Sequence, residues 1–185
     1  MRISLLSLAV LALLSSCNKH KHNPEAPTDK PTKKVVRDAV PLALSDGQLV
    51  LPIPIQFAGA GSTEVTPESL PMLEHVKSWL NQNRDTTLLR VEVHSDGDGS
   101  ARESQALTQA RALALCKRLV SLGADCKRVL PVGFGGTKPV ADGSTPDGKA
   151  KNRRVEFRPA ELRGKPLGGM PIDGGGQIAG DPCAK

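Results

Sequence analysis

The stretch from residue 88 to residue 123 changes its apolar period once, and this change constrains the fold more than any other feature of the sequence. Leu89, Val91 and Val93 alternate with polar residues, which predicts a half-buried strand. A glycine-rich loop follows at 95–99, and Ser100 with Glu103 has the pattern of a capping box that opens a helix. The helix carries its apolar residues on one stripe: Ala112, Leu115, Cys116, Leu119 and Leu122. A strand that runs into an amphipathic helix predicts a sheet with a helix packed against it.

The chain on either side of this stretch continues the alternation of strands and helices. Thr66, Pro67 and Glu68 supply a capping hydroxyl, a proline at the first helical position and an acidic first turn. They predict a first helix that ends at 81–83. Alternating apolar residues predict further strands at 128–134 and 152–158, with a loop between them.

Residues 42–57 precede the first helix and predict a hairpin followed by an edge strand. Ser45-Asp46-Gly47 has the composition of a turn between two apolar runs. The run 53–57 continues as an edge-like strand, because Pro52 and Pro54 cannot donate to a central ladder. The order is then strand, helix, strand, helix, strand, strand. We therefore expect an α+β fold, a two-layer sandwich with a mixed sheet and helices on one face.

The segments outside this region lack an apolar period. Seven of the 18 Gly and seven of the 15 Pro residues lie in the short segments 17–41 and 161–185, and this enrichment favours disorder there. We expect a folded domain over 42–160, with its core over about 50–160. A flexible linker at 17–41 would precede it, and a disordered Gly/Pro-rich tail at 161–185 would follow it.

The first residues have the features of an export signal. Arg2 precedes an apolar run over 3–14, which is too short to span a bilayer as a helix, since that takes about 20 residues. The run ends in Leu14-Ser15-Ser16-Cys17, which resembles a bacterial lipobox. This resemblance implies that residues 1–16 are removed and that Cys17 carries covalent lipid. It also implies an outer-membrane location, because Asn18 and not Asp follows the cysteine.

The net charge of +6 is modest for 185 residues and is expected for an ordinary solvated surface. A nucleic-acid role would need a basic stripe interleaved with aromatic residues, and the aromatic residues are only Phe57, Trp79, Phe134 and Phe157. His20 and His22 could touch a metal, but a solvated tether accounts for them.

The residues that can carry chemistry lie between Val91 and Arg111. Asp96 follows the strand at the start of the glycine-rich loop, and Arg111 borders the buried stripe of the helix that the loop enters. Gly97 and Gly99 permit close approach of a ligand and leave backbone N–H groups free to donate. From the residues alone two hypotheses remain. Asp96 and Arg111 bind a ligand, or they order the turn and pair with each other.

Several motifs, in this order and spacing, resemble the OmpA-like C-terminal domain family. They are Glu92-Val-His-Ser-Asp96, Gly99, Leu107-Thr108-x-x-Arg111-Ala112, Gly133-Phe-Gly135, Pro139 and Asn152-Arg153-Arg154-Val155. The resemblance implies binding of meso-diaminopimelate in uncrosslinked peptidoglycan stems. Asp96 would accept hydrogen bonds from its ammonium group, and Arg111 would fork onto its carboxylate. Leu107 and Thr108 would line the pocket. Arg153 would either support the ligand or be structural.

The chain departs from this family at four positions. The family often has Thr at Ser95, Asn at Ser104, Ser at Thr108 and Arg at Lys149. The loss of Asn matters most, because that residue would order the loop or touch the ligand. The Asp96-Gly-Asp98-Gly99 run also suggests calcium, but it lacks the further acidic ligands of an EF-hand loop. No metal site is therefore expected.

Cys116, Cys126 and Cys183 remain once Cys17 is assigned to lipid. Cys116 lies on the second helix and Cys126 just beyond its glycine end, so the chain could return alongside. An exported location permits disulfides. We predict a Cys116–Cys126 bridge, with two packed thiols as the alternative. Cys183 would then be unpaired in the tail or bonded to another molecule.

These features predict a non-catalytic outer-membrane lipoprotein that tethers the membrane to peptidoglycan. An enzyme acting on the wall would need a metal set or a nucleophile with its base, and only His75 and His94 lie in the domain. The expected partners are peptidoglycan, the membrane through the lipid on Cys17, and envelope proteins. Nucleic acid and a cofactor other than the lipid are not expected. The alternative is an assembly module of an envelope complex, with secondary wall binding.

Overall fold

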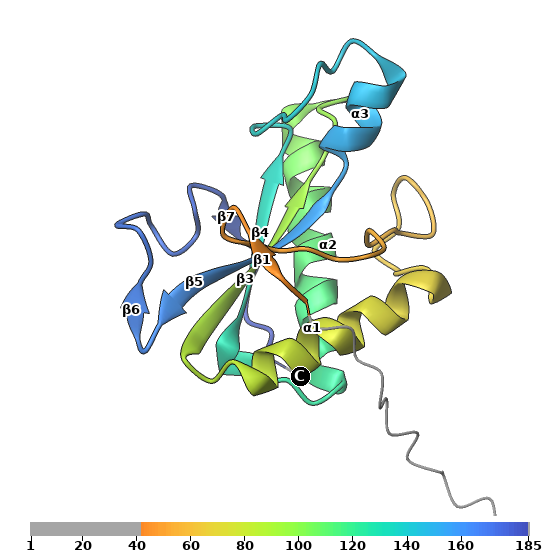
Figure 1. Cartoon of the computed structure of the whole chain (residues 1–185). Coiled ribbons are helices and arrows are strands. Elements are labelled where there is room, and N and C mark those ends of the chain that lie inside the picture. The colour runs from red at the N-terminus through yellow and green to blue at the C-terminus, as the bar shows by residue number, and fades with distance from the viewer. Residues whose placement is uncertain (1–41, 185) are drawn as a thin grey trace, which may run out of the picture. The chain divides into compact units, whose positions relative to one another are not determined.

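A computed structural model describes residues 42–184 (Figure 1). The signal at 1–16, the lipid on Cys17 and the linker at 17–41 lie outside the described residues, so they stay predictions. Within 42–184 no helix combines the length and the apolar character needed to cross a membrane.

A mixed sheet forms the centre, as the sequence predicts, and it has five strands. The strand order is β6-β5-β3-β4-β7. The strands are β3 (Thr86–His94), β4 (Val129–Gly135), β5 (Val155–Leu162), β6 (Lys165–Pro166) and β7 (Gln177–Ile178). β3 pairs parallel with β4, whereas the other pairs are antiparallel. The helix between β3 and β4 makes the parallel pair possible, since a parallel connection must cross over.

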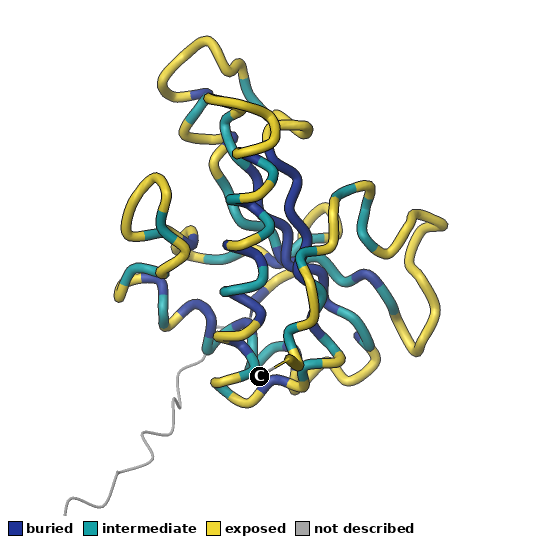
Figure 2. The backbone as a smooth tube through the Cα atoms, turned by 180° about the vertical axis from the view of Figure 1, so that it is seen from behind, coloured by how far each residue is buried: buried dark blue, intermediate teal, exposed yellow. Residues whose placement is uncertain are grey.

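Two helices pack on one face of this sheet and share its core. They are α1 (Leu70–Gln82), which follows the short 3-10 turn η1 (Pro67–Ser69), and α2 (Ala101–Ser121). Leu89, Val91 and Val93 of β3 are fully buried in one apolar core with residues of both helices. Figure 2 shows that the buried stretches of the backbone concentrate in the central strands. Ser100 caps α2 as predicted, since its hydroxyl accepts from the Glu103 N–H. The Glu103 carboxylate accepts from the Ser100 hydroxyl and not from the Ser100 N–H, so the capping box is only half formed. A second 3-10 turn, η2 (Cys126–Arg128), leads into β4.

The N-terminal hairpin forms, but the edge strand after it does not. β1 (Leu44–Ser45) and β2 (Gln48–Leu49) make a separate two-stranded sheet. The predicted strand at 53–57 contributes only one bridge, between Phe57 and Val65. The two prolines that suggested an edge position leave too few N–H groups for a ladder.

A short helix, α3 (Pro146–Asn152), lies where the sequence suggested a loop. Thr145 caps it by accepting from the Gly148 N–H, and Pro146 occupies the first turn. The signals of a helix start were therefore present. The helix is too short to show an apolar period, so the composition of the segment pointed to a loop.

The C-terminal segment differs from the disordered tail that the sequence predicts. Residues 163–184 cross the sheet face opposite the helices and add β7 beside β4. Arg90 Nη1 donates to the Ile172 carbonyl at 2.9 Å. At Gly174 the backbone has φ +64°, and an added Cβ would lie 2.6 Å from Arg90 Cζ. The glycines that suggested disorder thus permit close packing here. The tail also buries the polar side of β3, so the strand is buried on both faces and not on one.

The tail is tied down by a Cys126–Cys183 disulfide, with a Cα–Cα distance of 5.1 Å. The predicted Cys116–Cys126 bridge is therefore wrong. Cys116 lies on the buried stripe of α2 and is a free thiol within the apolar core. Its side chain is fully buried, whereas Cys126 lies half-buried in the turn beyond the helix, and burial raises the pKa of the Cys116 thiol.

Candidate functional site

A cavity of about 760 Å³ opens at the end of β3, and we call it the Asp96 cavity. Its walls come from the loop after β3, the first half of α2, the segment around 55–60 and residues 150–155. Four of the five predicted ligand residues line it: Asp96, Leu107, Arg111 and Arg153. The structure thus brings together residues that lie up to 57 positions apart in the sequence.

Asp96 forms the acidic side of the cavity. Its Oδ2 accepts from Arg153 Nη1 at 2.6 Å, and its Oδ1 accepts from the Asp98 N–H at 3.3 Å. Burial alone would raise the pKa of this carboxyl, but the hydrogen bonds from Arg153 and Asp98 outweigh it and lower the pKa below its usual value. Asp96 therefore offers an ionised acceptor at the cavity wall.

Arg111 forms the basic side and is held by backbone carbonyls. Its Nε donates to Ser62 O at 2.8 Å, and its Nη2 donates to Gly59 O and Ala60 O at 2.8 and 2.7 Å. The guanidinium also lies over the Phe57 ring, 4.3 Å from the ring centre. Burial lowers the pKa of Arg111, yet a guanidinium keeps its charge at neutral pH. Neutral oxygens thus orient this charge without cancelling it.

This arrangement changes the predicted mode of binding at Arg111. Two of its three nitrogens already donate to carbonyls, so the free end of the guanidinium is Nη1. A forked contact of Nε and Nη2 with a ligand carboxylate would first require both nitrogens to break their hydrogen bonds to the carbonyls of the 59–62 segment. The hypothesis that Arg111 pairs with Asp96 is also wrong, because the ion partner of Asp96 is Arg153.

Arg153 and Thr108 have different roles from each other. Arg153 follows α3, its side chain is 52% exposed, and it holds Asp96 at the cavity edge. Thr108 is fully buried and does not line the cavity, contrary to the prediction. Its hydroxyl donates to the carbonyls of Ser104 and Gln105 and accepts from the Gly135 N–H at 2.9 Å. Thr108 thereby joins α2 to the end of β4.

The loop after β3 is held from two sides. Ser104 Oγ donates to Asp98 O at 3.1 Å, and Lys149 Nζ lies 2.8 Å from Asp98 Oδ2. Ser104 therefore orders the loop, which is one of the two roles expected for the residue that it replaces. The sequence did not identify Lys149, Phe57 or the 59–62 carbonyls as part of the site. Backbone carbonyls have no side-chain signature that could have revealed them.

The sequence profile of the OmpA family matches residues 57–153, which is just over half of the chain. Three relatives are similar to it over the same region. The sodium-type flagellar protein MotY of Vibrio parahaemolyticus is 36% identical over 92 residues, which cover 50% of this chain and 31% of MotY. The probable lipoprotein YiaD of Escherichia coli is 32% identical over 96 residues, 52% of this chain and 40% of YiaD. The peptidoglycan-binding protein ArfA of Mycobacterium tuberculosis is 32% identical over 102 residues, 55% of this chain and 31% of ArfA.

A solved structure shares the fold. The peptidoglycan-associated lipoprotein of Burkholderia pseudomallei superposes with a TM-score of 0.52 at 24% identity, over 57% of this chain and 89% of that one. At this identity the likeness concerns the fold alone. The chain spans 31–40% of the length of the three relatives, so the similarity describes a shared domain.

Proposed function

The chain belongs to the OmpA family, and we propose that it is a non-catalytic outer-membrane lipoprotein that binds peptidoglycan through the diaminopimelate of its stem peptides. One observation carries the proposal. An ionised carboxylate at Asp96 and an uncancelled guanidinium at Arg111 line one cavity, which is large enough for an amino-acid side chain.

The chemistry of diaminopimelate fits these two groups. Its free end carries an ammonium and a carboxylate on one carbon. The ammonium can donate charge-assisted hydrogen bonds to Asp96, and the carboxylate can accept from Arg111 Nη1. The cavity excludes part of the water, which strengthens both contacts relative to the surface. Leu107 gives the methylene chain of the ligand an apolar wall.

The similarity to ArfA, a peptidoglycan-binding protein, supports a wall-binding role for this domain. Acylation of Cys17 would supply the membrane end of the tether, with residues 18–41 as the spacer. An envelope-assembly role is the second candidate, and the flagellar relative MotY favours it.

Sedimentation with purified sacculi tests the proposal. The full-length chain in detergent should pellet with sacculi that contain diaminopimelate. It should pellet less with sacculi that carry lysine at that position, because lysine lacks the carboxylate expected at Arg111. Asp96→Ala and Arg111→Ala should remain in the supernatant. The exposed variants Asp147→Ala and Arg102→Ala serve as matched controls.

The outcomes separate the two candidates. If the chain pellets with neither kind of sacculus, the tether proposal fails and the assembly role gains. If the wild type and both site variants pellet equally, wall binding stands but its assignment to the Asp96 cavity fails. Mass spectrometry of the purified protein, with Cys17→Ala as control, tests the lipid.

A further inference from the structure

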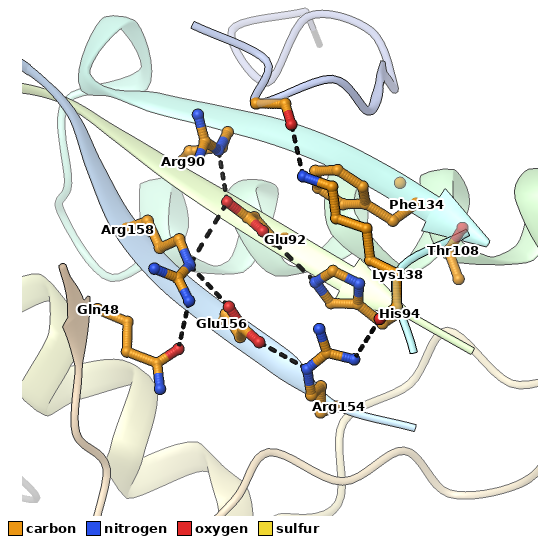
Figure 3. Close-up of polar contacts among 12 residues, drawn as sticks. Gln48, Arg90, Glu92, His94, Thr108, Phe134, Lys138, Arg154, Glu156 and Arg158 are labelled. Carbon is orange, nitrogen blue, oxygen red and sulfur yellow. Dashed lines mark hydrogen bonds and ion pairs between the residues drawn. The ribbon is translucent and has the colours of Figure 1, made fainter. Parts of the chain in front are cut away.

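The sheet face opposite the helices carries two rows of charged side chains, one on β3 and one on β5 (Figure 3). Arg90 lies directly opposite Arg158, and Glu92 lies directly opposite Glu156. Like charges in direct opposition are unfavourable. Each arginine instead pairs with a glutamate, either in its own row or, for Arg158 and Glu92, in the opposite row.

Each carboxylate of this network is held by guanidinium groups. Glu156 accepts from Arg154 Nε at 2.5 Å and from Arg158 Nε at 2.7 Å. Glu92 accepts from Arg90 Nε at 2.6 Å. The pKa values of the two carboxyl groups agree with this pairing. Burial would raise both, but the hydrogen bonds and charges around them lower them.

The C-terminal segment covers this network and leaves a cavity of about 240 Å³ beneath it, which we call the outer-face cavity. Its charged lining comprises Arg90, Arg154, Arg158, Lys138, Glu92 and Glu156. Met170 and Val140 give it an apolar rim. Lys138 crosses the gap, with its Nζ 2.6 Å from Gly174 O and over the Phe134 ring.

The charges of this lining do not balance. Four cations face two carboxylates, so two positive charges are in excess when His94 is neutral. Unused donors are also present. Neither Arg90 Nη2 nor Arg154 Nη2 has an acceptor among residues 42–184, although the other nitrogens of both side chains do. In Figure 3 the unbonded nitrogen of Arg154 points toward the His94 ring.

His94 is the second, independent indication of a ligand. It is 2% exposed, lines the outer-face cavity and stacks on Phe134. Its Nε2 faces Glu92 Oε2 at 3.4 Å, whereas its buried Nδ1 has no hydrogen-bond partner among the residues that the structure describes. Buried polar groups are rarely left without a partner.

A cation does not fit here as well as an anion. Glu92, His94 and Glu156 present ligand atoms within 4.8 Å of one another, as a metal site would. However, three of the four carboxylate oxygens already accept from arginine, and a metal ion would add charge to a positive excess. An anion would reduce that excess and meet the unused donors.

We propose that the outer-face cavity binds a phosphate-class dianion, held by Arg154, Lys138 and His94. The excess of two positive charges matches a phosphate group, which carries about −1.5 to −2 charges at neutral pH. The small volume admits inorganic phosphate or the phosphoryl end of an ester whose remainder passes the Met170 rim. This site goes beyond the wall-binding function. His94 and Arg154 line both this cavity and the Asp96 cavity, whereas Lys138 and Arg158 line this one and not the other.

Calorimetric titration of the full-length chain, in a phosphate-free buffer of low ionic strength, tests the site. Inorganic phosphate should bind with one-to-one stoichiometry, and acetate at equal ionic strength should bind far more weakly. Glycerol 3-phosphate distinguishes the source of the group. If it binds like phosphate the site takes phosphoryl esters, and if only phosphate binds the site takes the free ion.

Lys138→Gln is the diagnostic variant, because Lys138 is exposed and lines this cavity but not the Asp96 cavity. It should weaken phosphate binding about fivefold, the upper range for one exposed charge pair. The matched control Lys165→Gln, on the exposed β6, should bind as the wild type does. Both variants should pellet with sacculi normally, which separates this site from wall binding.

Three results would overturn the proposal. One is no phosphate binding by the wild type at millimolar concentration. Another is unchanged binding by Lys138→Gln and by a second variant, Arg158→Gln, which also lines only this cavity. The last is an equal loss in the Lys165→Gln control, which would indicate a general surface effect.

Discussion

Asp96 forms its ion pair with Arg153, 2.6 Å away, while Arg111 on the other side of the same cavity donates to three backbone carbonyls. The two charges that sequence motifs place in one site are therefore kept apart by separate partners. A ligand with both charges can bridge them without first breaking an internal salt bridge between them.

Removal of Arg153 should free Asp96 and change its titration. In Arg153→Ala we expect the pKa of the Asp96 carboxyl to rise toward its usual value, because a strong hydrogen bond and a nearby charge are lost. The free energy of unfolding should fall by at most about 1 kcal/mol, since the pair is partly exposed. NMR titration of the Asp96 carboxyl carbon measures the pKa. An unchanged pKa would show that Arg153 does not hold Asp96 in solution.

Arg111→Lys should abolish wall binding although it keeps the charge. A lysine ammonium is a point donor on a flexible stem and cannot reach three carbonyls and a fourth partner as a planar guanidinium can. The stack on Phe57 would also weaken, at about 0.5–2 kcal/mol for such a contact. Sacculus sedimentation and urea unfolding measure the two effects. Arg102→Lys, an exposed change on the same helix, is the control. Wild-type sedimentation by Arg111→Lys would mean that charge alone suffices.

The three central strands, α1, α2 and the position of Asp96 and Arg111 at one cavity could be predicted from the sequence, because each is marked locally. Alternation marks β3, capping residues mark α2, and family motifs mark the residues that line the Asp96 cavity. The C-terminal segment could not be predicted, because it folds by backbone contacts to Arg90 and by a disulfide distant in sequence. The same limit applies to the 59–62 carbonyls around Arg111. Thr108 was misplaced because its spacing fits either the cavity or the contact with β4.

The Cys126–Cys183 disulfide should contribute strongly to stability. It closes a loop with a sequence separation of 57, and loop-closure entropy assigns about 4 kcal/mol to a crosslink of this span. We expect Cys183→Ser to lower the free energy of unfolding by up to that amount, as measured by urea denaturation. The tail should also become sensitive to protease in the native state. Cys116→Ala is the control, because it removes a free thiol and should leave the tail protected. Equal tail cleavage in the wild type would contradict a docked segment.

Acid should weaken the folded state through Glu92 and Glu156. Burial alone would raise the pKa of both carboxyl groups. Contacts from His94 and Arg90 at Glu92, and from Arg154 and Arg158 at Glu156, lower the pKa by more than burial raises it, so both pKa values lie below the usual value of 4.5. A carboxyl with a lowered pKa in the folded state stabilises the fold above its unfolded pKa. That stability is lost as the pH falls through the folded pKa. The free energy of unfolding should therefore be flat from pH 7 to about 5 and then decline.

Glu156→Gln should be less stable at pH 7 and decline less between about pH 5 and 3, whereas the exposed Glu64→Gln should follow the wild type. Urea unfolding across this range measures both slopes, and parallel curves for wild type and Glu156→Gln would show that Glu156 is not held ionised by Arg154 and Arg158.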